Sequence, residues 1–216
     1  MRRAGIHRLS LADLDALLEL QHQSLPDTLS ARLGPSFNVL YHRTMFGEPL
    51  YLCDGYFADD VLVGYLSYTP STVRLLRSAL RHHAFAFAAT LFWSILPSRQ
   101  RWRLAARIAR SVLVPRSEPA PDVSAELLSI AVRPEYRGRK LPERGTVGSL
   151  LLRNALSTLR ESGAASVKAC VTPGDPLANA FYRKHGFQFL HSIERYGLHA
   201  NLYVRDLTES ASVQPA

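Results

Sequence analysis

The chain has 216 residues, 47% hydrophobic and 20% charged, a balance that excludes a disordered protein and suffices for one well-buried core. Its formal net charge of +8 belongs to one segment, because residues 71–116 contain nine arginines and no acidic residue. Two cysteines without the spacing of a zinc site or a disulfide framework, and an N-terminus without an apolar signal segment, predict reduced thiols, no metal and a cytoplasmic location.

The first third of the chain predicts two helices and a hairpin. After a short strand at 6–9, Ser10 is a plausible N-cap for a helix through Leu20, because leucines recur there at helical spacing. A second helical stretch covers about 28–45 and is interrupted by Gly34-Pro35. Residues 49–70 predict an antiparallel hairpin with a longer loop around Asp59-Asp60. The arginine-rich residues 71–121 follow as an insertion.

The second half alternates strands and helices. A strand is expected at 123–132, a helix at 146–162 ended by Gly163, and a strand at 165–172. Pro176 fits the first position of a helix that runs to about His185, Gly186 closes it, and two strand-like runs fill 187–207. This order predicts an α/β fold: a mixed sheet with helices on both faces, as a single domain over 1–207 with a flexible tail at 208–216.

An anion site is expected where the strand ending at Val132 leads through a loop rich in Gly and Arg into the helix that starts near Val147. Free N–H groups and the helix dipole favour a phosphate at such a helix start. A plain connection between strand and helix is the alternative.

Three stretches resemble the GNAT superfamily of acyl-CoA-dependent N-acetyltransferases: "AELLSIAVRPEYRG", "GTVGSLLL" and "DPLANAFYRKHGF", within residues 123–187. The resemblance implies a GNAT-like mixed, mostly antiparallel central sheet, here with a helical insertion between the third and fourth strands. It implies transfer of an acetyl group from acetyl-CoA to a primary amine by direct attack. The stretch "TLSARLGPSFNVLYHRTMF" is also loosely similar to bacterial members associated with polysaccharide synthesis.

The resemblance also implies the residues that contact CoA. Main-chain groups at the end of the strand would bind the pantetheine arm and the acetyl carbonyl, the glycine loop would bind the phosphates, and Asp175 stands where the family usually has Asn. These residues are Ile130, Ala131, Val132, Arg137, Gly138, Arg139, Arg144, Gly145, Thr146, Val147, Gly148, Ser149 and Asp175.

Six extra residues interrupt this loop, so its register is open. Counted back from Gly148, Thr146 takes the place of the first motif glycine; counted forward from Arg137, Lys140 does. The half from Gly145 to Ser149 is expected to bind the pyrophosphate because it adjoins the helix start. Arg139, Lys140 and Arg144 would then reach outlying phosphates.

Two residues are expected to be catalytic. Tyr182 matches the family's proposed general acid toward the leaving thiolate, and a core tyrosine is the alternative. Glu126, six residues before Val132, matches the glutamate of the histone-acetyltransferase branch and could relay a proton through water. A strand-end carboxylate that faces solvent or pairs with an arginine is the alternative.

The acceptor and the insertion leave several hypotheses. The preferred acceptor is a small-molecule amine such as an amino sugar or its nucleotide derivative; the alternatives are protein N-termini or lysines, and a non-catalytic acyl-CoA-binding module. Within 71–116, Arg99, Arg103, Arg107 and Arg110 follow one helical face. That pattern fits peripheral contact with the inner face of the membrane, a phosphorylated acceptor or a solvated helix face. Nucleic acid is not expected, and the oligomeric state stays open.

Overall fold

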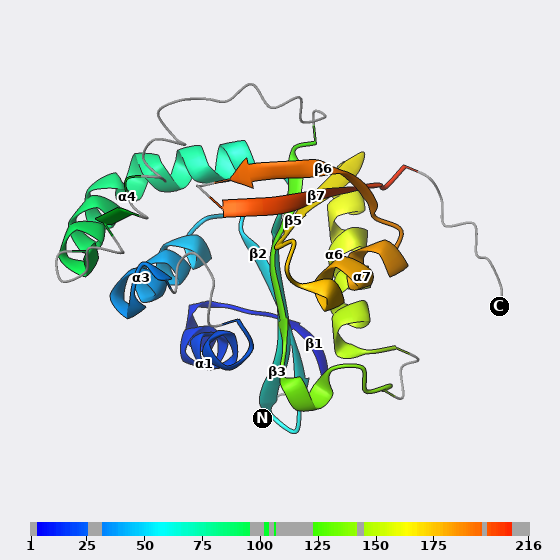
Figure 1. Ribbon diagram of the computed structural model, residues 1–216. Coiled ribbons are helices and arrows are strands. Elements are labelled where there is room, and N and C mark those ends of the chain that lie inside the picture. Colours follow the sequence, from blue (N-terminus) through cyan, green and yellow to red (C-terminus); the bar gives the residue numbers. More distant parts are fainter. Residues whose placement is uncertain are drawn as a thin grey trace.

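The computed structural model describes residues 4–25, 32–95, 102–103, 106, 123–141, 145–195 and 198–208 (Figure 1). Its centre is a seven-stranded sheet in the order β1-β2-β3-β4-β5-β7-β6. The strands are β1 (Gly5–Arg8), β2 (Leu52–Ala58), β3 (Val61–Thr69), β4 (Ala125–Val132), β5 (Ser166–Val171), β6 (Gln188–Arg195) and β7 (Leu198–Asp206). Only β4 and β5 pair in parallel.

Helices cover both faces of this sheet, with α1, α3 and α4 on one side and α6 and α7 on the other (Figure 1). The helical elements are η1 (Leu11–Asp13), α1 (Leu14–Ser24), α3 (Pro35–Phe46), α4 (Thr72–Ile95), η2 (Pro134–Tyr136), α6 (Val147–Glu161) and α7 (Pro176–Lys184). Each layer has its own buried apolar cluster. The predicted mixed, mostly antiparallel sheet with helices on both faces is therefore confirmed, as is a helical insertion between the third and fourth strands.

Local capping explains where the helices begin. Ser10 and Asp13 form a capping box, with Ser10 N donating to Asp13 Oδ2 over 2.9 Å. The helix that follows reaches Ser24 instead of the predicted Leu20. Gly34, with a φ of 114°, and Pro35 at the first helical position set the start of α3. Residues 28–31 of the second predicted helix lie outside the described residues.

The hairpin differs from its prediction because its loop is short. Strand β2 continues to Ala58, and Asp59 and Asp60 alone form the turn, with φ values of 49° and 64°. Asp tolerates this left-handed conformation, which two-residue hairpin turns require. Strand β2 passes through Asp54, although an Asp at this position of the sequence suggests a loop. Its buried carboxylate is bound by Arg8 (2.9 Å) and Tyr68 (2.6 Å), so it is tolerated inside the sheet.

The sheet opens between β4 and β5. Their ladder contains three pairs, Ala125↔Val167, Glu126↔Lys168 and Leu127↔Ala169. Directly after the third pair the register between β3 and β4 shifts, since Ser67 pairs with Ser129 and Tyr68 with Leu127. A bulge of this kind bends a strand. Beyond the ladder, the main-chain groups of β4 and β5 therefore form no hydrogen bonds with each other.

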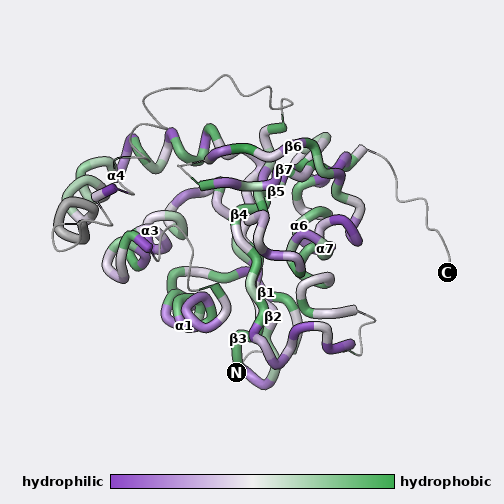
Figure 2. Tube along the Cα trace, in the orientation of Figure 1, coloured by the Kyte–Doolittle hydropathy of each residue, from purple (hydrophilic) through white to green (hydrophobic). Residues whose placement is uncertain are grey.

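The insertion begins as one helix of 24 residues, α4. Hydrophilic and hydrophobic residues alternate along it (Figure 2). No helix in the described part of the chain is long and apolar enough to cross a membrane. Most of the second, basic helix expected at 99–110 lies outside the described residues.

Candidate active site at the opening between β4 and β5

The start of α6 lies beside this opening. Thr146 is the N-cap, and its side-chain oxygen accepts a hydrogen bond from Ser149 N over 3.3 Å. The N–H groups of Val147 and Gly148 have no partner in a preceding turn, because they belong to the first turn of the helix. These two donors, which have no partner among the described residues, and the positive end of the helix dipole can bind a phosphate.

A short antiparallel bridge joins the two sides of the inserted loop segment where it meets α6. Leu141 N donates to Gly145 O over 2.8 Å, and the two residues form an antiparallel bridge. Residues 142–144, Arg144 among them, lie outside the described residues. Because Gly145 belongs to this bridge and directly precedes the N-cap, the half from Gly145 to Ser149 is continuous with the helix start. Which register of the loop binds the pyrophosphate stays a prediction.

Small residues bring α6 close to its neighbours. A Cβ placed on Gly148 would lie 3.4 Å from the ring of Phe181 and 3.7 Å from Val132 Cγ2. A Cβ on Gly64 would lie only 2.6 Å from Val147 Cγ1. The helix start is therefore packed directly against α7 and the end of β4.

The hydrogen-bond pattern of β4 decides which main-chain groups face the opening. Arg133 N donates to Val63 O over 2.8 Å, which makes Gly64 and Val132 a non-hydrogen-bonded pair. The main-chain groups of Val132, and by alternation those of Ile130, therefore point away from β3. Those of Ala131 point toward β3. Of the three predicted contacts, two present main-chain groups to the opening, and Ala131 does not.

Arg137 ties the end of β4 to α1 and is exposed. Its Nε donates to Val132 O over 3.0 Å, and Nη2 donates to Ser24 O over 3.3 Å. Ser24 Oγ also donates to Val132 O over 3.3 Å. The carbonyl of Val132 is thus occupied within the protein, which leaves its N–H group for a ligand. Gly138 adopts a φ of 72°, as the turn after Arg137 requires.

Two further basic residues of the loop, Arg139 and Lys140, are exposed. Arg139 lies over the ring of Tyr136, 5.5 Å from its centroid, and Lys140 is exposed. Asp175 caps α7, its Oδ1 accepting from Ala178 N over 2.9 Å. Such a capping carboxylate stabilises the helix that carries Tyr182.

Tyr182 is buried against three aromatic rings, those of Phe181, Phe187 and Tyr203. Its hydroxyl has no hydrogen-bond partner among the residues described. Burial raises the pKa of Tyr182 well above its ordinary value, and the nearby Cys170 raises it further. Cys170 follows Ala169, the last β5 residue paired with β4. A neutral, unpaired hydroxyl near the opening is suited to donate a proton.

Glu126 lies in the paired part of β4, before the opening. It is 3% exposed, so the solvent-facing alternative is wrong. Its Oε2 accepts from Thr72 Oγ1, at the start of α4, over 2.7 Å. Ile130 lies four positions beyond Glu126, about 13 Å along the strand. Any proton that Glu126 exchanges with the opening must therefore travel through water.

His185, at the end of α7, contacts the start of α6 and was not predicted from the sequence as a site residue. Its Nε2 lies 2.9 Å from Ser149 Oγ, which lies 2.9 Å from Thr146 Oγ1, so it supports the hydroxyl groups at the start of α6. Burial lowers the pKa of His185, and neighbouring cations, Lys184, Arg205 and Arg153, lower it further. The sequence around His185 indicated only the end of a helix, because its partner Ser149 lies 36 positions away in the chain.

Two histidines on the helices of the other layer, His22 on α1 and His42 on α3, differ in burial. His22 is exposed on α1. His42 is buried on α3, with Nε2 2.9 Å from Gln21 Oε1, and desolvation lowers its pKa to about 4. His42 is therefore a neutral packing residue at neutral pH.

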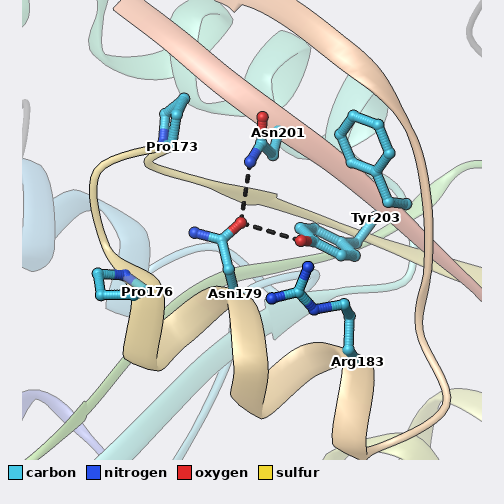
Figure 3. Close-up of a pocket in the computed structure, with 7 residues that line it drawn as sticks. Pro173, Pro176, Asn179, Arg183, Asn201 and Tyr203 are labelled. Atoms are coloured by element: carbon cyan, nitrogen blue, oxygen red, sulfur yellow. Dashed lines mark hydrogen bonds between the residues drawn. The ribbon is translucent and has the colours of Figure 1, made fainter.

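A pocket of about 370 Å³ lies on the other flank of α7, toward β6 and β7 (Figure 3). At its centre Asn179 Oδ1 accepts from Asn201 Nδ2 and from Tyr203 Oη, both over 2.9 Å (Figure 3). The lining residues are Pro173, Pro176, Asn179, Arg183, Phe189, Asn201 and Tyr203. None of the predicted CoA or catalytic residues lines this pocket.

Comparison with known proteins agrees with this fold. The sequence model of the acetyltransferase (GNAT) family matches residues 14–187. No curated protein sequence matches the chain. Among solved structures, the fold is similar to the PaiA N-acetyltransferase of Thermoplasma acidophilum in complex with coenzyme A, at 16% identity and a TM-score of 0.57, covering 95% of this chain and 99% of that one.

Two further structures share the fold. An N-acetyltransferase from Staphylococcus aureus has 13% identity and a TM-score of 0.59, covering 96% of this chain and all of its own. The ribosomal-protein-alanine N-acetyltransferase of Brucella melitensis has 19% identity and a TM-score of 0.54, with 93% and 98% covered. The family match spans most of the chain, and the chain therefore belongs to the GNAT family of acetyltransferases.

Proposed function

We propose that the protein transfers an acetyl group from acetyl-CoA to the primary amine of a small molecule, such as an amino sugar or its nucleotide derivative. The observation that carries the proposal is the opening between β4 and β5, with the start of α6 and the Tyr182 hydroxyl beside it. The pyrophosphate of CoA would bind the N–H groups of Val147 and Gly148, and the outward-facing N–H groups of β4 would hold the pantetheine arm and the carbonyl.

The charges around the helix start support an anionic substrate. Arg153 reaches Gly145, since its Nη2 would lie 3.1 Å from a Cβ there. Arg153, Lys184 and Arg205 are close enough to His185 to lower its pKa. CoA carries negative phosphates, which such cations attract.

In the proposed reaction a neutral amine attacks the thioester carbonyl. A C–N bond forms, the C–S bond breaks, and Tyr182 donates its proton to the departing sulfur. The nitrogen loses one proton as the amide forms, and this proton returns to Tyr182 through solvent, so that CoA leaves as the thiol. The N–H groups that face the opening, those of Ile130 and Val132, are placed to polarise the carbonyl oxygen. Glu126 would accept, through water, the proton that the ammonium form of the acceptor must lose. All four residues belong to β4 or α7.

The enclosure of Glu126 supports a small acceptor. The first turn of α4 covers this end of β4, because Thr72 N donates to Ser124 O over 3.0 Å and the Thr72 hydroxyl binds the carboxylate. The water path between the acceptor and this carboxylate has to run beneath α4, so the amine has to approach this covered end of β4, which favours a compact molecule over a polypeptide chain.

An acceptor screen tests this proposal. CoA release would be measured with acetyl-CoA and a panel of amino sugars, nucleotide amino sugars, polyamines, and peptides with free N-termini or lysines. We expect turnover with a sugar amine and none with peptides. Turnover confined to peptides would replace the proposal with protein acetylation, the activity for which the relative from Brucella melitensis is named.

A further inference from the structure

Helix α4 exposes large apolar side chains along one stripe. Val73, Leu76 and Leu80 are 63%, 38% and 51% exposed, and their spacing of three and four residues places them on one face. The buried side of the same helix is formed by Leu75 and Ala79, which pack into the core under α1 and α3. The exposed stripe is therefore not the face that anchors α4 to the protein.

A row of arginines runs beside this stripe. Arg74, Arg77 and Arg81 each follow one of the stripe's apolar residues, so the two rows lie about 100° apart around the helix. All three arginines are exposed, and none has a hydrogen bond or ion pair with another described residue. The helix contains no Asp or Glu. Phe85, one turn beyond Arg81, is 87% exposed.

We propose that α4 docks on an anionic lipid bilayer through this docking face, formed by Val73, Arg74, Leu76, Arg77, Leu80, Arg81 and Phe85. From Val73 to Phe85 the face is about 18 Å long. A helix that lies in the bilayer interface buries apolar side chains among the acyl chains and keeps its cations near the lipid phosphates. The helix extends past α3, away from the sheet (Figure 1), so that a flat surface can approach it.

Other partners fit this face less well. A nucleic acid would neutralise the arginines but leave the neighbouring apolar row in water. A second copy of the chain that used the same face would bring two rows of arginines together. An anionic bilayer satisfies both rows at once. The proposal is independent of which amine the enzyme acetylates.

Vesicle flotation of the full chain tests the proposal. We expect binding to vesicles of phosphatidylcholine with 30% phosphatidylglycerol (about one third anionic lipid), weak binding to phosphatidylcholine alone, and loss of binding as salt screens the charges. Each arginine near such a surface contributes about fivefold to the partition coefficient, so the triple variant R74Q/R77Q/R81Q should bind on the order of 100-fold more weakly. Phe85→Ser should weaken binding about tenfold or more through the apolar contact.

A matched variant controls for total charge. R43Q/R183Q/K184Q removes three exposed cations that lie outside the docking face, and it should keep most of the binding. Circular dichroism of each variant establishes that it is folded. Equal losses in the two triple variants, or no binding of the unmodified chain to anionic vesicles at low salt, would overturn the proposal. Binding to RNA with no binding to vesicles would overturn it in favour of a nucleic-acid surface.

Discussion

Replacement of Tyr182 by Phe isolates a single hydroxyl group. That hydroxyl has no hydrogen-bond partner among the described residues, and the three aromatic contacts of the ring persist in Phe. The free energy of unfolding should therefore change by less than about 1 kcal/mol. If Tyr182 protonates the departing thiolate, kcat should fall about 10²-fold, or about 2.7 kcal/mol of transition-state stabilisation. The affinity for CoA should stay nearly constant.

Tyr203→Phe is the matched control. Tyr203 is buried and stacks on Tyr182, with ring centroids 6.2 Å apart, but its hydroxyl donates to Asn179 Oδ1 over 2.9 Å. Removing that bond should cost about 1 kcal/mol of stability and leave kcat within about threefold of the original. The two variants should therefore differ in opposite ways. Tyr182→Phe should lose turnover and keep its stability, whereas Tyr203→Phe should lose stability and keep its turnover.

Steady-state kinetics with the acceptor found by the screen, calorimetric titration of CoA and urea unfolding provide the three readouts. The pH profile adds a fourth. Because burial raises the pKa of Tyr182 above its ordinary value of 10.0, ionisation of this hydroxyl should cause no loss of turnover up to pH 10. Unchanged turnover in Tyr182→Phe, or an equal loss in Tyr203→Phe, would remove Tyr182 from the mechanism.

Two other predictions follow from the loop and from the buried histidine. Deleting the six residues 139–144 restores the usual loop spacing and should change CoA affinity by no more than about tenfold in calorimetry. The deletion removes point charges near outlying phosphates and the bridge between Leu141 and Gly145, but it keeps the helix start at 145–149. Complete loss of binding by a folded variant would show that the other half of the loop holds the pyrophosphate. The folded pKa of His42, about 4, lies below its ordinary 6.5, so the unfolded chain binds more protons between these values. Stability should therefore fall by up to about 3 kcal/mol as the pH drops from 6.5 to 4. Urea unfolding of His42→Gln should lack that part of the slope, and an identical slope would contradict this assignment.

Local signals in the sequence predicted most of the secondary structure. The Ser10 capping box, the Gly34-Pro35 break, Pro176 at a helix start and the glycines after α6 and α7 act within three or four residues, so they can be read without the fold. The hairpin loop was the exception. Asp54 suggests a turn when taken alone, and only its partners elsewhere in the chain make its burial tolerable: Arg8 and Tyr68 from two other strands, and Asn154 from α6.

The candidate site, too, was predictable only in part from the sequence. The motif residues predicted a helix start for phosphate and Tyr182 beside it, because family motifs preserve spacing along the chain. Which main-chain groups face the ligand was decided by the register between β3 and β4, since shifting a strand by one residue reverses their direction. The contact of His185 with Ser149 and the cover of α4 over Glu126 join residues 36 and 54 positions apart. Contacts at such separations depend on how the layers pack. The sequence by itself therefore determined the elements and the chemistry of the motif, whereas the packing of the layers decided which groups reach the opening.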